Sequence, residues 1–252
     1  MLLKLVFSIS LEPQTMFAAP SGGFISKTPH PPSPIAANIR TGPSSYLIDT
    51  EKCGAAVLRF GRDQTIMAQG DIPRYCYQVT SGCIRTVKLL DDGRRQIGEF
   101  LFAGDIFGWE GGDRREFAAE AVTPSTLQRF RLDEVERQTA GDAGFARRLH
   151  HYIISQVRLA RERLVVVGCK TATERACSFL VEMHGRLAAP GRPDFILPMT
   201  RTDIADYLGV TLETVSRAFS GLRQRGMVTV SQSNIVIRDQ LALCSAGSLL
   251  VH

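Results

Sequence analysis

The sequence lacks the features that are typical of membrane proteins, of proteins that bind zinc or an iron–sulfur cluster, and of several common enzyme classes. No run reaches the roughly 18 apolar residues that a membrane span needs. The cysteines include no C-x-x-C pair, so neither a zinc site nor an iron–sulfur cluster is indicated. A nucleophile elbow, a P-loop, an H-E-x-x-H motif and paired catalytic carboxylates are also missing. These absences favour a cytoplasmic, non-enzymatic protein with free thiols and without a cofactor.

Charge of one sign is only slightly in excess. The chain has 30 Lys and Arg against 25 Asp and Glu, which leaves a net charge of +5. This surplus is a mild bias toward anionic partners such as nucleic acid. With 44% hydrophobic and 22% charged residues in 252 positions, the sequence is typical of a soluble protein of one or two domains.

The two ends of the chain show no sustained helical or strand period. Residues 1–45 are rich in proline and glycine and are interpreted as a flexible leader. Residues 241–252 are interpreted as a C-terminal tail. We assign no function to the leader.

Residues 46–140 consist of short runs rich in Val, Ile, Phe and Tyr, separated by Gly, Pro and an Asp-Asp-Gly turn. This rhythm is typical of an antiparallel barrel or sandwich. The expected strands are Val57–Phe60, Thr65–Met67, Tyr75–Thr80, Gly82–Leu90, Arg94–Phe102, Phe107, Phe117–Ala121 and Ser125–Arg131.

A helical period follows over residues 141–168. Apolar side chains spaced by three and four residues form a stripe along this helix. Because an α-helix rises about 1.5 Å per residue, the stripe is longer than a small barrel can cover. We therefore expect a second copy of the chain to cover the remainder, although packing on the chain's own barrel is the alternative. The residues expected at this dimer interface are Phe145, Leu149, Tyr152, Ile153, Gln156, Leu159, Ala160 and Val167.

A new domain is expected over residues 169–240. Gly168 breaks the long helix, and Thr171 or Thr173 caps a second helix that extends through Met183. Cys169 lies at the hinge between the two helices. Because it neighbours Lys170, this thiol is a possible redox site.

The stretch from Thr202 to Gly226 has the pattern of a helix-turn-helix. Gly209 supplies the turn, Val210 fills the space between the helices, and Thr211 caps the second helix. A β-hairpin over residues 227–237 would form a wing. The positions expected to face inward are Ile204, Ala205, Leu208, Val215, Phe219 and Leu222.

The outer face of the second helix carries the candidate DNA contacts. Glu213 and Arg217 stand at positions i and i+4 and point the same way. Arginine bonds guanine O6 and N7, and glutamate accepts from cytosine N4, so the two can read one G·C pair. An unremarkable surface ion pair is the alternative. The base-reading candidates are Leu212, Glu213, Ser216 and Arg217, and the phosphate candidates are Arg201, Thr211, Arg223 and Arg225.

Taken together, these segments resemble the Crp/Fnr superfamily of bacterial transcription regulators over roughly residues 50 to 240. The motifs F-G-R-D-Q-T-I at Phe60, Y-Q-V-T-S-G at Tyr77, D-G-R-R-Q-I at Asp92 and G-D-I-F-G at Gly104 occur in family order. The resemblance implies an α+β fold with an N-terminal antiparallel β-roll like a cyclic-nucleotide-binding domain. A long dimerisation helix and a C-terminal winged helix-turn-helix would follow. The implied partners are double-stranded DNA, RNA polymerase and a second copy of the chain.

The subgroup is indicated by one match and two departures. Glu213, Ser216 and Arg217 match the E-x-x-S-R pattern of the FNR and FixK branches, which read T-T-G-A half-sites. No cysteine cluster precedes Cys53, which disfavours an iron–sulfur cluster. Phe117-Ala118 stands where a cyclic-nucleotide clamp would have Arg-Ser. The resemblance therefore implies a FixK-like activator of low-oxygen genes that needs neither an iron–sulfur cluster nor a cyclic nucleotide.

One alternative function stays open at this point. Arg114 and Arg115 lie close to the position of the missing clamp. If the alignment is shifted by a few residues, one of these arginines would take the clamp position and bind the phosphate of a cyclic nucleotide. The alternative is accordingly a cyclic-nucleotide-gated transcription regulator.

Overall fold

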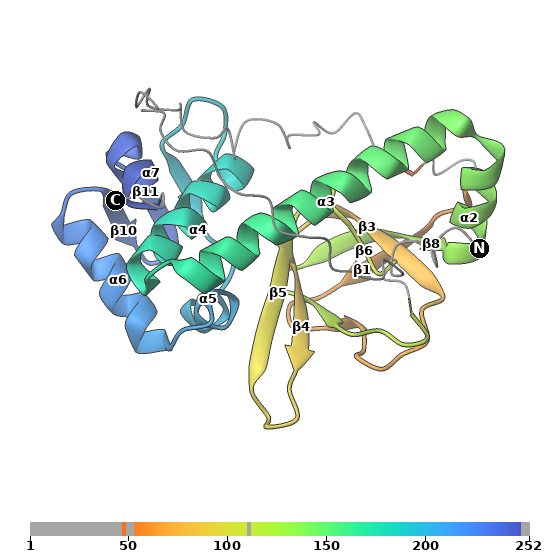
Figure 1. The fold of residues 1–252 in the computed structure, drawn as a ribbon, viewed down its shortest axis with the longest axis horizontal. Helices are drawn as coiled ribbons and strands as arrows, with labels where there is room; N and C mark the ends of the chain where they lie inside the picture. The colour runs from red at the N-terminus through yellow and green to blue at the C-terminus, as the bar shows by residue number, and fades with distance from the viewer. Residues whose placement is uncertain (1–46, 49–52, 110–111, 248–252) are drawn as a thin grey trace, which may run out of the picture. The chain divides into compact units, whose positions relative to one another are not determined.

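The computed structural model describes residues 47–48, 53–109 and 112–247. The predicted leader and residues 248–252 of the predicted tail lie outside this part. Figure 1 shows the order of the elements. Their bounds are β1 (Ala56–Phe60), β2 (Thr65–Met67), β3 (Tyr75–Ser81), β4 (Ile84–Leu89), β5 (Arg95–Leu101), β6 (Ile106–Phe107), β7 (Ala118–Ala121), β8 (Ser125–Arg131), α2 (Leu132–Gly141), α3 (Ala143–Cys169), α4 (Ala172–Leu187), β9 (Asp194–Ile196), α5 (Arg201–Leu208), α6 (Leu212–Gln224), β10 (Val228–Ser231), β11 (Asn234–Ile237) and α7 (Gln240–Gly247).

The first eight strands form a β-roll of two antiparallel sheets. Their strand orders are β1-β8-β3-β6 and β2-β7-β4-β5. Side chains from both sheets fill the space between them: Val79 and Leu127 of the first sheet share one buried cluster with Ile84 and Ala121 of the second. Each strand expected from the sequence is present, with ends that differ by at most a few residues. At the tip of the β4–β5 hairpin, Gly93 has a φ of 81°, which a residue with a Cβ rarely adopts.

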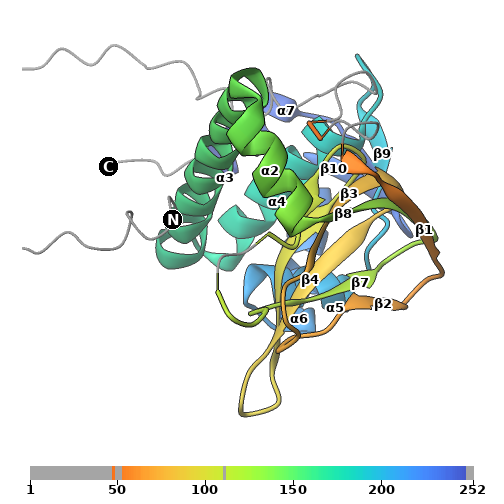
Figure 2. The ribbon, with the colours of Figure 1, turned by 90° about the vertical axis from the view of Figure 1, so that its right-hand side faces the viewer.

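Two helices lead from the roll to the second half of the chain. Helix α2 was not expected from the sequence; it is short, and Val135 is its buried residue. Asp142 then caps α3 by accepting from the Phe145 amide. Helix α3 runs through Gly168 and ends at Cys169, so the chain breaks slightly later than expected. In Figure 2, α2 and α3 lie on one side of the roll strands.

The second half is a winged helix-turn-helix. Thr171 opens α4 with a capping box to Glu174, and Thr200 opens α5 with a capping box to Asp203. Gly209 ends α5 in the left-handed conformation, at a φ of 64°. Strands β10, β11 and β9 form a small antiparallel sheet that supplies the wing.

The segment interpreted as a tail contains a further helix, α7, packed on α4. Asp239 accepts from the Ala242 amide at 2.8 Å, which caps the helix start. Leu243 is fully buried, and Ser178 Oγ donates to the Gly247 carbonyl at 3.1 Å. The helical domain therefore extends past residue 240.

Candidate nucleic-acid interface

The second helix of the helix-turn-helix, α6, has one buried and one open face. Val215, Phe219 and Leu222 are buried, as the sequence predicts. The hydroxyl of Thr211 accepts from the Thr214 amide and caps the helix. All the base-reading candidates lie on the open face, where a shallow hollow of 370 Å³ is lined in part by Glu213, Ser216 and Arg217.

Glu213 and Arg217 form an ion pair on this face. Arg217 Nη2 lies 3.2 Å from Glu213 Oε1, and the two side chains are 72% and 76% exposed. A pair this exposed is worth at most about 1 kcal/mol. A bidentate contact to a base is worth about 1 to 3 kcal/mol. The ion pair therefore holds the two side chains only weakly on this face.

The other candidates differ in how open they are. Arg223 and Arg225 are exposed near the end of α6. Ser216 Oγ donates to the Leu212 carbonyl, so its hydroxyl faces the helix backbone. Arg201 is half-buried with its guanidinium 4.0 Å from the ring centre of Phe219, and burial lowers its pKa. Arg201 is thus the phosphate candidate that is least open.

A group of charges between the roll and α5 was not found by sequence reasoning. Asp203, only 1% exposed, accepts through Oδ2 from the amide and hydroxyl of Thr200. Its Oδ1 accepts from Arg85 Nη1 at 3.1 Å and from Arg95 Nη2 at 2.9 Å. The first helix of the helix-turn-helix is therefore tied to strands β4 and β5 through one buried carboxylate. We call Arg85, Arg95 and Asp203 the junction.

The structure corrects part of the predicted dimer interface. Phe145 is fully buried against the chain's own roll, and Leu149 and Tyr152 pack on the same cluster. The Tyr152 hydroxyl also donates to the Ile106 carbonyl at 3.2 Å. Phe145 therefore belongs to the chain's own core, and Leu149 and Tyr152 are partly buried against that core.

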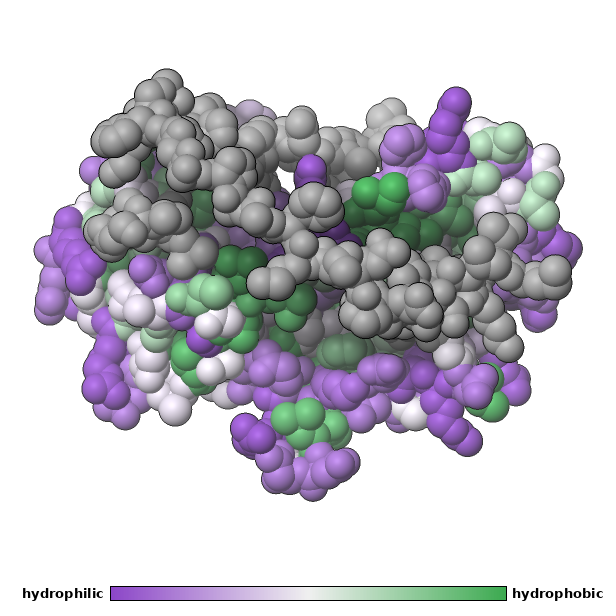
Figure 3. Space-filling model, viewed as in Figure 1, coloured by the Kyte–Doolittle hydropathy of each residue, from purple (hydrophilic) through white to green (hydrophobic). Residues whose placement is uncertain are grey.

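An exposed stripe lies beside them on α3. Its members are separated by four, three, four and three residues, the heptad spacing of a coiled coil. Leu164 is 72% exposed and Val157 46% exposed. Figure 3 shows hydrophobic side chains along the line that α3 takes in Figure 1. We call this set the α3 stripe: Ile153, Val157, Ala160, Leu164 and Val167.

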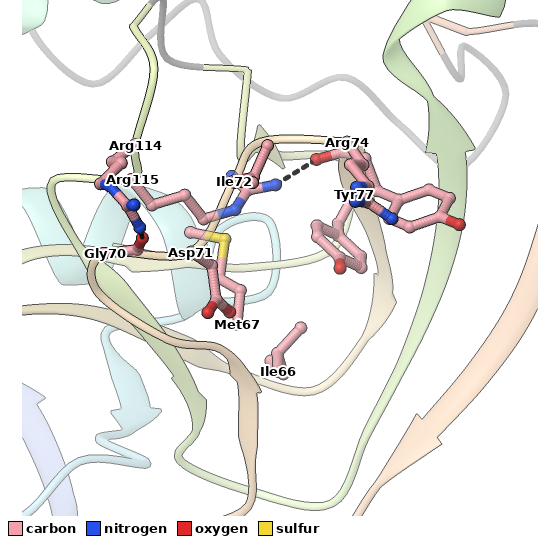
Figure 4. Close-up of a pocket in the computed structure, with 10 residues that line it drawn as sticks. Ile66, Met67, Gly70, Asp71, Ile72, Arg74, Tyr77, Arg114 and Arg115 are labelled. Atoms are coloured by element: carbon pink, nitrogen blue, oxygen red, sulfur yellow. Dashed lines mark hydrogen bonds between the residues drawn. The ribbon is translucent and has the colours of Figure 1, made fainter.

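The roll contains a pocket of 440 Å³ (Figure 4). Arg114 and Arg115 both line it. Arg115 is 4% exposed and donates to the carbonyls of Gly108 and Tyr75, while Arg114 donates to the carbonyl of Gly70. Both guanidinium groups thus already bind backbone carbonyls within the roll.

Cys169 is exposed at the end of α3. The Lys170 ammonium donates to Ser178 Oγ at 2.7 Å, so its charge is directed at that hydroxyl. Burial raises the pKa of the Cys177 thiol to about 11, in keeping with an unreactive core position. A redox role for Cys169 stays a prediction.

Two searches covered the described residues only. No group of three or more His, Cys, Asp or Glu side chains among them is arranged to hold a metal ion. No helix in this part of the chain combines the length and apolarity needed to cross a membrane.

Comparison with known proteins identifies both halves of the chain. Residues 57–142 match the cyclic nucleotide-binding domain family, and residues 174–246 match the Crp-like helix-turn-helix domain family. The nitrogen fixation regulation protein FixK of Azorhizobium caulinodans is 38% identical over 73% of this chain and 76% of that protein. FixK of Bradyrhizobium diazoefficiens is 33% identical over 91% of this chain and 96% of its own length.

A solved structure agrees with these matches. FixK2 from Bradyrhizobium japonicum superposes with a TM-score of 0.73 at 38% identity, covering 77% of this chain and 98% of that chain. The fold and the helix-turn-helix define a DNA-binding transcription regulator, not an enzyme. The chain belongs to the Crp/Fnr family and is FixK-like within it.

Proposed function

We propose that this chain is a cytoplasmic, dimeric, sequence-specific activator of low-oxygen genes. It binds palindromes with T-T-G-A half-sites, and needs neither a cyclic nucleotide nor an iron–sulfur cluster. The observation that carries the proposal is the open face of α6, where Glu213 and Arg217 project from a helix whose other face is buried. A FixK-like relative is named as a nitrogen fixation regulator, and FnrA of Stutzerimonas stutzeri is named as a transcriptional activator.

The two copies in this proposal meet along the α3 stripe. It is apolar, exposed and spaced in heptads, which is the pattern of a two-helix seam. A two-fold dimer presents two copies of α6, so its operator is a palindrome. RNA polymerase is the further partner that activation requires.

Selection of bound duplexes from a random pool tests the proposal. The full-length protein is incubated with the pool, and the retained DNA is sequenced. We expect T-T-G-A half-sites arranged as a palindrome with one preferred spacing. Enrichment of single half-sites, or of no sequence at all, contradicts the proposed function.

We expect DNA binding to be independent of cyclic nucleotides. Arg115 already binds the carbonyls of Gly108 and Tyr75, and Arg114 binds the carbonyl of Gly70, so neither candidate clamp arginine can hold a phosphate without losing these bonds. Gel shifts should give the same affinity with and without cyclic AMP or cyclic GMP, and calorimetry should give no binding heat. A large gain in DNA affinity on adding either nucleotide favours the cyclic-nucleotide-gated alternative.

A further inference from the structure

One arginine joins the end of the long helix to the turn of the helix-turn-helix. Arg175 lies half-buried near the start of α4. Its Nε donates to the Lys170 carbonyl at 3.0 Å, its Nη1 to the Leu208 carbonyl at 2.9 Å, and its Nη2 to the Val167 carbonyl at 2.6 Å. Every nitrogen of this guanidinium therefore binds a backbone carbonyl.

The three carbonyls belong to the C-terminal ends of two helices. Val167 lies in the last turn of α3 and Lys170 is its cap residue, whereas Leu208 is the last residue of α5. Carbonyls in a last turn have no partner within their helix and carry the negative end of its dipole. A guanidinium is permanently charged and presents its donors in a rigid fork. It can thus hold two helix ends in a fixed relation.

The two helix ends carry the two parts of the DNA-binding machinery. Val167 is the last member of the α3 stripe, where the copies of the proposed dimer meet. Leu208 precedes the Gly209 turn, after which α6 begins at Leu212. Arg175 accordingly links the end of the proposed dimer face to the end of α5, directly before the turn that leads into α6.

We propose that Arg175 is a positioning residue that fixes α6 relative to the α3 stripe and thereby sets which half-site spacing the protein accepts. The inference rests on the proposed function, since spacing has meaning only for a dimer on a palindrome. One extra base pair moves a half-site by about 3.4 Å along the duplex and about 35° around it. A rigid link rejects such a displacement, whereas a loose link at residues 168–171 tolerates it.

The test compares Arg175→Met with the wild-type protein on a panel of palindromes. The duplexes carry two T-T-G-A half-sites at centre-to-centre spacings from about 8 to 13 base pairs, which bracket one helical turn. We expect the wild type to prefer one spacing at least about tenfold over its neighbours, a difference of about 1.4 kcal/mol. The Arg175→Met protein should bind neighbouring spacings within about threefold of each other. The ratio between spacings is the readout, because losing one positive charge weakens binding to all of them alike.

Two further variants separate positioning from folding. Arg175→Lys keeps the charge but replaces the fork with a single ammonium, and should give intermediate selectivity. Arg192→Met is the matched control, because within the described part of the chain the Arg192 guanidinium bonds to its near neighbour Asp194 and to no helix end. It should keep the wild-type spacing preference. Circular dichroism and melting temperature establish that each variant is folded.

The outcomes distinguish this inference from the proposed function. A folded Arg175→Met protein that keeps a sharp preference, or loses specific binding at every spacing, overturns the positioning role alone. Unfolding of both Arg175 variants assigns the residue to fold stability and also overturns that role. A wild-type protein without any spacing preference overturns the palindromic dimer itself, and this inference with it.

Discussion

Replacing Arg217 with alanine is expected to weaken binding to a T-T-G-A palindrome by roughly 2 to 6 kcal/mol, because a bidentate base contact is worth about 1 to 3 kcal/mol and the dimer makes it twice. The substitution should change the stability of the folded protein only slightly. The ion pair to Glu213 is exposed on both sides and contributes at most about 1 kcal/mol. Binding to the palindrome and to a scrambled duplex at the same ionic strength measures the effect.

Two controls define what the Arg217→Ala result means. Arg131→Ala also removes an exposed, ion-paired arginine, but on the roll, and should leave both affinities close to wild type. Arg223→Ala removes a phosphate candidate and should weaken both duplexes about equally, with a flatter salt dependence. If Arg217→Ala also weakens both duplexes equally, Arg217 contacts only the backbone of the DNA.

Leu164→Asp is expected to convert the protein to a monomer at micromolar concentration. Leu164 is the most exposed large member of the α3 stripe. Burying one leucine is worth about 1.5 to 3 kcal/mol, and a two-fold interface buries two copies. Losing both raises the dimer dissociation constant at least about a hundredfold, before the cost of placing two carboxylates in the interface. Light scattering and sedimentation measure the change in mass.

His151→Asp is the matched control for the dimer prediction. His151 is exposed on α3 but lies outside the α3 stripe. The same substitution there should leave the dimer intact. A wild-type protein that is monomeric at these concentrations without DNA, or a Leu164→Asp protein that stays dimeric, contradicts the α3 stripe as the interface.

The helix-turn-helix could be predicted because its signals are local. Gly209 at the turn, Thr211 at the cap and the inward spacing of Val215, Phe219 and Leu222 all act within a short stretch of chain. The roll strands were predictable for the same reason, since alternation and turn residues mark each of them. The junction was not, because Arg85 and Asp203 lie 118 positions apart. Nothing in the local pattern relates them.

The apolar periodicity of α3 was read correctly from the sequence, but it did not show which residues of the helix remain exposed for a dimer interface. It carries two apolar series with the same four-three spacing, offset by one residue and therefore about 100° apart around the helix. Periodicity alone cannot say which series faces the roll. Phe145, Leu149 and Tyr152 form the series that packs on the roll, half-buried Gln156 and Leu159 continue its spacing, and the outer series is the α3 stripe.

The junction has a consequence for how far the winged helix-turn-helix can be treated as a portable module. A fragment cut at Lys170 takes Asp203 away from Arg85 and Arg95. A carboxylate buried between two guanidinium groups then becomes a hydrated group at the start of α5, and the helix loses one side of its support. A chimera that grafts this domain onto another roll must therefore bring both arginines with it, so the natural unit of exchange includes strands β4 and β5.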